Sequence, residues 1–219
     1  MMRAAWAVFA KDVRTELRAR YALSATFVFA LSTLAIVSYA VGPSFGGRPE
    51  LLAAFLWTVL LFSASAGLAQ AFVREVERKT WFTMRLVAPP GAILLGKWAV
   101  NLVLLMATEA LIVPMFLALF GIGIRSVSGF LAVTALATFG LSAAITLVAA
   151  LLAQARAHGA LVSALAFPLV FVPVMAAVTG TRHALVETGV PGTEVRVLAA
   201  YAGVLVAMGL VLSEHVLED

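Results

Sequence analysis

The chain has 219 residues, of which 63% are hydrophobic and 12% charged, with a formal net charge of +4. Soluble domains contain roughly 45–50% apolar and about 25% charged residues. A globular fold of this size cannot hide so much apolar surface from water, so the composition predicts a protein embedded in the lipid bilayer. The basic residues flank apolar runs, which indicates membrane orientation and not nucleic-acid binding. The absence of cysteine excludes disulfides, thiol nucleophiles and thiolate metal sites.

Residues 4–20 form the first predicted element, an amphipathic helix. Apolar side chains recur at helical spacing on one side, and charged side chains fill the other. The apolar members are Trp6, Phe9, Val13, Leu17 and Tyr21. A helix of this kind lies in the membrane interface with its aromatic face in the acyl boundary. The alternative is a disordered basic tail.

Six apolar segments follow, each long enough to cross about 30 Å of hydrocarbon as a helix. They are 22–41, 50–73, 92–120, 127–153, 160–180 and 197–213. Helices are required because lipid offers no partner to unpaired backbone groups. The strands of a membrane barrel would alternate polar and apolar residues, which these runs do not. The predicted fold class is therefore an all-α integral membrane protein with six transmembrane helices.

The basic residues set the predicted orientation. With six spans, both termini lie on one side of the membrane. Only four of the 15 basic residues fall on the other side, namely Arg48, Arg125, Arg182 and Arg196. By the positive-inside rule the termini and the loop between spans two and three are cytoplasmic. The longest outer loop is expected over 181–196.

The densest charge in the chain lies between the second and third spans, at 74–90. Its polar members are Glu75, Glu77, Arg78, Lys79 and Arg85, and Pro89-Pro90-Gly91 ends it before the third span. One interpretation is a short helix docked in a groove of an ATPase, the other a solvated loop with surface ion pairs. The sequence leaves both open.

The segment from Gly91 to Trp98 nearly matches the phosphate-binding loop G-x-x-x-x-G-K-[ST]. The match is rejected because Trp98 replaces the Mg²⁺-binding hydroxyl and no strand precedes the loop. Lys97 and Trp98 are instead expected at the level of the headgroups, at the start of a membrane helix. The chain then has no nucleotide site of its own, and any ATP binds to a partner subunit.

Glu109 is the carboxylate predicted deepest within a span, where a charge costs roughly 2.5–3.5 kcal/mol. Asn101 and Thr108 lie on neighbouring parts of the same helix, so the three residues are expected to form an intramembrane polar seam. The seam either lines a substrate path or contacts another subunit, or it supplies hydrogen bonds for helix packing.

Pro168 and Pro173 lie in the fifth span. Each removes a backbone donor, so the helix is expected to kink or break, and the freed carbonyls need new partners. The pair is either a hinge for gating or a static kink. His183 is weak as a haem ligand because no supporting group lies near it in the sequence. With no metal cluster or catalytic dyad in the spans, no catalytic or metal-binding residue is assigned and the chain is not expected to be an enzyme by itself.

A run of residues resembles the signature of ABC-2-type permeases. It comprises Glu75-x-Glu77-x-x-Thr80, Leu86, Pro89 and Gly96-Lys97, with Lys79 where the pattern usually has glycine. In that superfamily the segment after the second span contacts the nucleotide-binding subunit. The resemblance thus implies one permease domain over 1–219, with ATPase-coupling residues Arg74, Glu75, Glu77, Arg78, Lys79, Thr80 and Leu86.

Within that superfamily the chain most resembles the CcmB family of cytochrome c maturation. The shared features are Lys11-Asp12, Glu16, Gly42-Pro43, Leu56-Trp57, Gly96-Lys97, Asn101 and the proline pair in 167–174. The resemblance implies a permease subunit of the bacterial inner membrane for haem export or delivery. It implies a CcmA-like ATPase that binds ATP, the haem-handling membrane protein CcmC and the small subunit CcmD as partners. Haem is then the transported or partner-bound ligand, and this chain itself binds no cofactor.

Two other functions stay open at this point. One is an ABC-2 permease for a drug, lipid or polysaccharide. The other is a secondary transporter that needs no ATPase, which the scarcity of charge within the spans disfavours.

Overall fold

The computed structural model describes residues 1–41, 47–68, 88–154 and 159–216. The described residues form seven helices and no strand. The helices are α1 (Met2–Ala19), α2 (Tyr21–Val41), α3 (Pro49–Leu68), α6 (Pro90–Phe120), α7 (Val127–Gln154), α8 (Gly159–Val186) and α9 (Gly192–Val216). The all-α class predicted from the sequence is confirmed.

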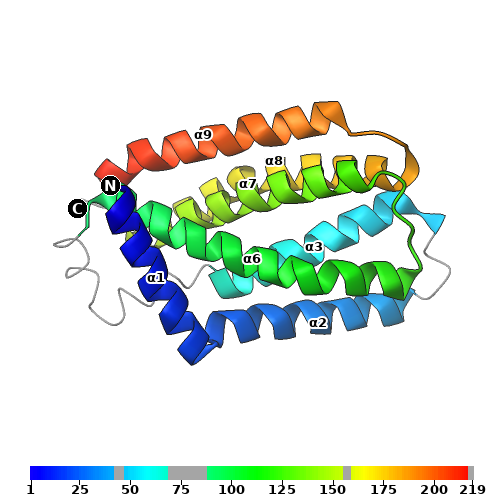
Figure 1. Cartoon of the computed structure of the whole chain (residues 1–219), viewed down its shortest axis with the longest axis horizontal. Helices are drawn as coiled ribbons and strands as arrows, with labels where there is room; N and C mark the ends of the chain where they lie inside the picture. Colours follow the sequence, from blue (N-terminus) through cyan, green and yellow to red (C-terminus); the bar gives the residue numbers. More distant parts are fainter. Residues whose placement is uncertain (42–46, 69–87, 155–158, 217–219) are drawn as a thin grey trace.

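Helices α2 to α9 run side by side along the long axis of the molecule, and α1 lies across one end of them (Figure 1). α7 is the most enclosed of the span helices, with α6, α8 and α9 packed around it. α6 begins, and α9 ends, at the end of the bundle where α1 lies. The helices therefore form a bundle with a capping helix at one end.

Five of the described helices are long and apolar enough to cross a membrane. They lie in α2, α6, α7, α8 and α9, and the apolar part of α3, Pro49–Ser65, is shorter. The second span was expected over 50–73, and residues 69–73 lie outside the described part of the chain. The structure thus supports a multi-pass membrane protein with five long candidate spans.

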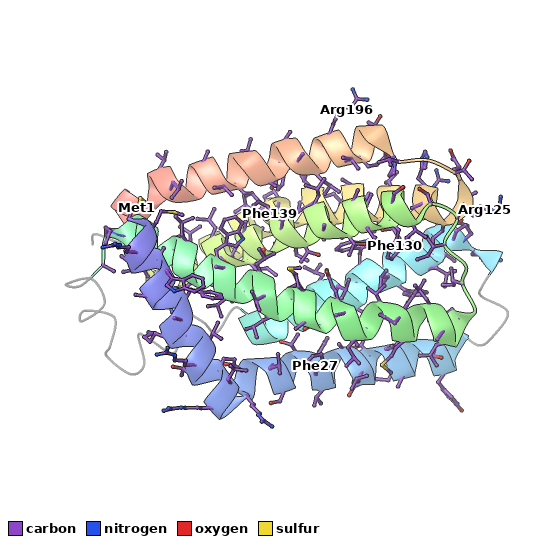
Figure 2. All side chains as sticks on the ribbon, in the orientation of Figure 1. Met1, Phe27, Arg125, Phe130, Phe139 and Arg196 are labelled. Carbon is purple, nitrogen blue, oxygen red and sulfur yellow. The ribbon has the colours of Figure 1, made fainter. Side chains whose placement is uncertain are left out.

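The outward-facing surface of the bundle is apolar along its length. Large hydrophobic side chains are exposed on α2, α6 and α9, among them Ile36, Tyr39, Met106, Val204 and Val211. Figure 2 shows Arg125 and Arg196 toward the end opposite Met1. In water this exposed apolar surface would be unfavourable, whereas lipid tails solvate it.

The largest core cluster joins α2, α3, α6, α7, α8 and α9. Trp57 is fully buried in it, and its indole Nε1 donates a hydrogen bond to Thr181 Oγ1 at 2.9 Å. Buried indole N–H groups need such a partner, and in a membrane the partner also ties two helices together.

The outer loop expected over 181–196 is mostly helical, so that expectation is wrong. α8 continues to Val186 and α9 begins at Gly192. The reason is packing, because Ala184 and Leu185 at the end of α8 are buried and Thr181 receives the Trp57 hydrogen bond. Sequence hydropathy ended the span at its polar residues, but tertiary contacts carry the helix further.

α1 turns sharply into α2 at Arg20, which has φ 52° and is left-handed. Glu16 stabilises this junction, since its carboxylate Oε1 accepts a hydrogen bond from the Leu23 backbone N–H at 2.9 Å. The first N–H groups of a helix lack intrahelical partners, so Glu16 supplies one to α2. This fixes the direction of α1 relative to the bundle.

Candidate functional site

Gly96 allows α1 to pack very closely against the start of α6. A Cβ at this position would lie 2.7 Å from Val8 Cβ and 2.8 Å from the Ala5 carbonyl oxygen. Because one of these atoms is backbone, no side-chain movement can relieve the clash. Gly96 is therefore required by close helix packing, which is a frequent role of small residues in membrane proteins.

Lys97 makes the second part of this α1–α6 contact. Its Nζ lies 3.2 Å from Asp12 Oδ2, and its side chain is only 1% exposed. Lys11 lies 3.0 Å from the other Asp12 oxygen. α1 covers Lys97, so its charge is received by Asp12 and not by solvent. We call Gly96, Lys97, Asp12 and Val8 the α1–α6 clamp.

Trp98 faces α7. Its Nε1 donates a hydrogen bond to Ser142 Oγ at 3.0 Å. Its ring packs edge-on against the ring of Phe139, with the ring centroids 4.6 Å apart. Gly91 to Trp98 lie within continuous helix α6. The rejection of a phosphate-binding loop at this position is therefore confirmed.

The three residues of the predicted polar seam are all buried, but they make separate contacts. Asn101 Nδ2 donates to Thr146 Oγ1 of α7 at 2.9 Å. Thr138 Oγ1, also on α7, lies 2.5 and 2.6 Å from the two carboxyl oxygens of Glu109. Thr108 donates to the Leu104 carbonyl within its own helix. Two of the three thus connect α6 to α7, as packing hydrogen bonds do.

The fifth span was expected to kink or break at its prolines, and it does not break, because α8 runs from Gly159 to Val186 with Pro168 and Pro173 inside it. Pro173 cannot donate to the carbonyl four residues earlier, that of Leu169. Tyr201 of α9 replaces the missing donor, and its hydroxyl lies 3.0 Å from Leu169 O. The freed carbonyl therefore finds a partner on a neighbouring helix, as the membrane requires.

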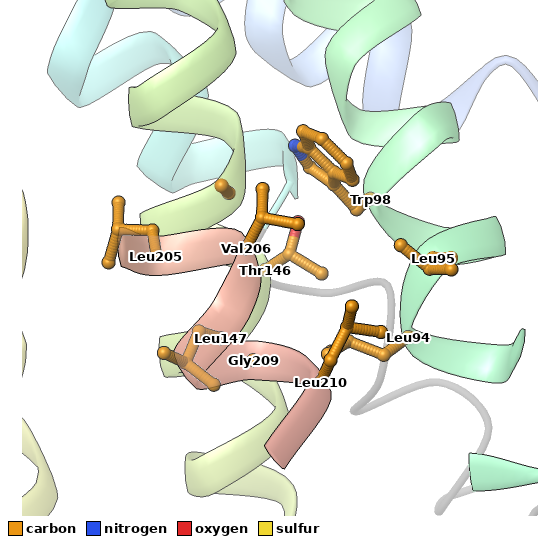
Figure 3. A pocket seen from close by; sticks show the side chains of 10 residues that line it. Leu94, Leu95, Trp98, Thr146, Leu147, Leu205, Val206, Gly209 and Leu210 are labelled. Atoms are coloured by element: carbon orange, nitrogen blue, oxygen red, sulfur yellow. The ribbon is translucent and has the colours of Figure 1, made fainter. Parts of the chain in front are cut away.

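A small apolar cavity lies between α6, α7 and α9, beside Trp98 and Thr146 (Figure 3). Its volume is about 20 Å³. Room for a water molecule requires about 10–15 Å³, and small-molecule sites usually have 300–1,000 Å³. This cavity thus accommodates about one water and is not a site for a large ligand.

The seven predicted ATPase-coupling residues lie outside the described residues; they are Arg74, Glu75, Glu77, Arg78, Lys79, Thr80 and Leu86. The end of the segment is described. Ala88 is buried in a cluster with Val8 of α1, Ile93 and Leu94 of α6, and Ala149 of α7. Pro90 then occupies the first turn of α6, where its missing N–H costs nothing. The segment therefore joins α6 at the α1–α6 clamp.

His183 lies in the last turn of α8, where its Nε2 is 3.3 Å from Glu187 Oε2. In the part of the chain that the structure describes, no three His, Cys, Asp or Glu side chains gather as metal ligands. The imidazole of His183 is therefore paired with the nearby carboxylate of Glu187.

These features define a class of protein: a multi-pass α-helical membrane protein whose polar contacts join helices. The family model described as "CcmB protein" matches residues 3–217, so the chain belongs to the CcmB family. The family is one of membrane transport proteins for haem in c-type cytochrome biogenesis. A search of curated proteins gives no match.

Sequence reasoning did not predict these contacts for five residues that make them: Asp12, Thr138, Ser142, Thr146 and Tyr201. The hydroxyl residues carry no signal of their own, since threonine is ordinary in membrane helices. Asp12 offered one signal, because it and Glu16 are the two carboxylates of a helix whose other charged residues are basic.

Proposed function

We propose that this chain is the permease subunit of an ABC transporter that exports or delivers haem for c-type cytochrome biogenesis. It crosses the bacterial inner membrane six times with both termini in the cytoplasm. A CcmA-like ATPase binds the ATP, and CcmC, with CcmD, handles the haem. The observation that carries this proposal is the family match over nearly the whole chain.

Segment 74–90 receives the movement of the ATPase in this proposal. The contacts of its described end support the role. Ala88 packs between α1, α6 and α7, and Pro90 begins α6 directly after it. A displacement of the segment therefore acts on the α1–α6 clamp, and α6 passes it to α7 through Asn101 and Glu109. Pro168 and Pro173 then give α8 a place to bend as its neighbours move.

The test is co-purification of the tagged chain with the ATPase, combined with ATP hydrolysis by the complex. The variant is Glu75→Lys with Glu77→Lys. The matched control is Glu187→Lys with Glu194→Lys. It also reverses two carboxylate charges, but at the other end of the bundle. We expect the first variant to insert normally but to lose ATPase association or coupled hydrolysis, and the control to keep both.

The substrate requires its own measurement. Cells that lack the chain are expected to lose covalent haem attachment to c-type cytochromes, and the wild-type gene to restore it. Normal ATPase coupling in the Glu75 and Glu77 variant would contradict the role of the segment. Normal cytochrome maturation without the chain would contradict the haem function.

A further inference from the structure

α1 exposes a face that is purely cationic. Arg3, Arg14 and Arg18 are all exposed and fall within about 60° of arc on a helix of 3.6 residues per turn. Within the described residues, no salt bridge of these three arginines is present. We call them the arginine face of α1.

The two carboxylates of α1 do not neutralise this face, because both are turned inward. Asp12 is 15% exposed and pairs with Lys97 in the clamp. Glu16 is buried and accepts the Leu23 N–H. An ordinary surface helix would present its acidic side chains beside its basic ones as ion pairs. Here the fold removes the negative charges and leaves the positive ones outside.

An apolar face adjoins the arginine face. Trp6 is 68% exposed and Leu17 65%, and the Trp6 ring packs against Phe9 at 5.2 Å. Trp6 and Leu17 lie within about 60° of Arg3 around the helix. The helix itself crosses the end of the bundle and does not run along it (Figure 1). Trp6 and Leu17 can therefore enter the acyl boundary while the arginines lie at headgroup depth.

From this arrangement we propose that α1 is a binding surface for anionic phospholipid headgroups of the leaflet in which it lies. Charge complementarity selects the occupant, because the face carries three positive charges and no acid, and an anionic headgroup has the net negative charge that a zwitterionic one lacks. A protein partner is the less favoured occupant, since it would have to cover exposed Trp6 and Leu17 as well. In a bilayer the lipid tails cover both side chains, so no protein partner is needed for this purpose.

The experiment titrates fluorescent phosphatidylglycerol, and separately phosphatidylcholine, into the purified full chain. The variant is Arg3→Gln/Arg14→Gln/Arg18→Gln. The matched control is Arg125→Gln/Arg182→Gln/Arg196→Gln, which removes three exposed arginines from other positions. Each arginine of the face is expected to contribute about fivefold to phosphatidylglycerol affinity, so the variant loses about a hundredfold. Phosphatidylcholine affinity and the control are expected to stay unchanged.

Two further measurements keep the test decisive if the variant folds poorly. Salt should weaken phosphatidylglycerol binding to the wild type, because exposed charges are screened. The triple Arg→Lys variant should retain most of the affinity, since it keeps the charge. Equal affinity of the wild type for both lipids overturns the proposal. So does a triple glutamine variant that keeps phosphatidylglycerol affinity but loses the ATPase, because the face would then bind a protein.

Discussion

The hydroxyl of Tyr201 on α9 lies 3.0 Å from the carbonyl oxygen of Leu169 on α8, where Pro173 has removed the normal backbone donor. A proline in one helix is thus compensated by a tyrosine on another. This contact allows α8 to contain a proline in its interior without losing its helical path. It also makes the conformation of α8 depend on the position of α9.

Replacement of Tyr201 by phenylalanine removes only the hydroxyl. We expect a loss of about 1 kcal/mol of stability, in the range measured for hydrogen bonds between membrane helices. Pro173→Ala restores the backbone donor to Leu169, so the double variant Tyr201→Phe/Pro173→Ala should recover most of that loss. Thermal unfolding of the four proteins in nanodiscs measures the cycle. Additive losses would show that the tyrosine does not compensate for the proline.

Gly96→Ala is expected to disrupt the α1–α6 clamp, because the new Cβ would lie 2.8 Å from a backbone oxygen of α1. Overpacking of this kind costs typically 1–3 kcal/mol. Gly203→Ala is the matched control, since nothing lies within 4 Å of its Cβ position on α9. Protease accessibility of α1 should rise in the Gly96 variant alone. Equal behaviour of the two variants would argue against close packing at Gly96.

Removal of one partner of the Lys97–Asp12 pair is expected to destabilise the protein more than removal of both partners. Asp12→Asn removes a partner carboxylate from a lysine that is 1% exposed, which costs up to about 3–5 kcal/mol for a buried pair. The double variant Asp12→Asn/Lys97→Met carries no charge to compensate and should be more stable than the single variant. Lys11→Gln, at an exposed pair, should cost less than about 1 kcal/mol. A double variant no more stable than Asp12→Asn would contradict the pairing.

Glu109 is expected to act through its hydrogen bond to Thr138. Glu109→Gln keeps groups that can accept from and donate to the Thr138 hydroxyl, so assembly and cytochrome c maturation should remain near normal. Thr138→Val leaves the carboxyl without this partner and should destabilise by about 1 kcal/mol. For both variants, the yield of the purified complex measures assembly, and the amount of haem covalently attached to c-type cytochromes measures maturation. Normal assembly with failed maturation in Glu109→Gln would instead indicate that the ionisable carboxyl takes part in transport.

The polar seam shows how far sequence could predict a site. Helical spacing put Asn101, Thr108 and Glu109 near one side of the helix, and all three are buried, as the cost of polar groups in lipid favours. The spacing could not supply Thr146 and Thr138, because these lie on α7, and hydrogen-bond partners across helices depend on rotation and depth of packing. The result is two separate interhelical contacts in place of one continuous seam.

Lys97 shows the opposite case. A lysine near the start of a membrane helix ordinarily extends to the headgroups, and nothing local to Gly96-Lys97 indicates otherwise. The close approach of α1 covers it, and Asp12, 85 residues away in sequence, receives its charge. The same contact turns the carboxylate away from the surface and so creates the arginine face.

The sequence by itself determined that this chain is an all-α membrane protein of the CcmB type, with an amphipathic N-terminal helix and a charged segment at 74–90. Hydropathy and charge decide these properties, and both are summed along the chain. Only the tertiary structure decided which charges remain exposed and which freed backbone groups find partners. Those outcomes depend on contacts between helices that are far apart in sequence, as Tyr201 with Leu169 and Lys97 with Asp12 demonstrate.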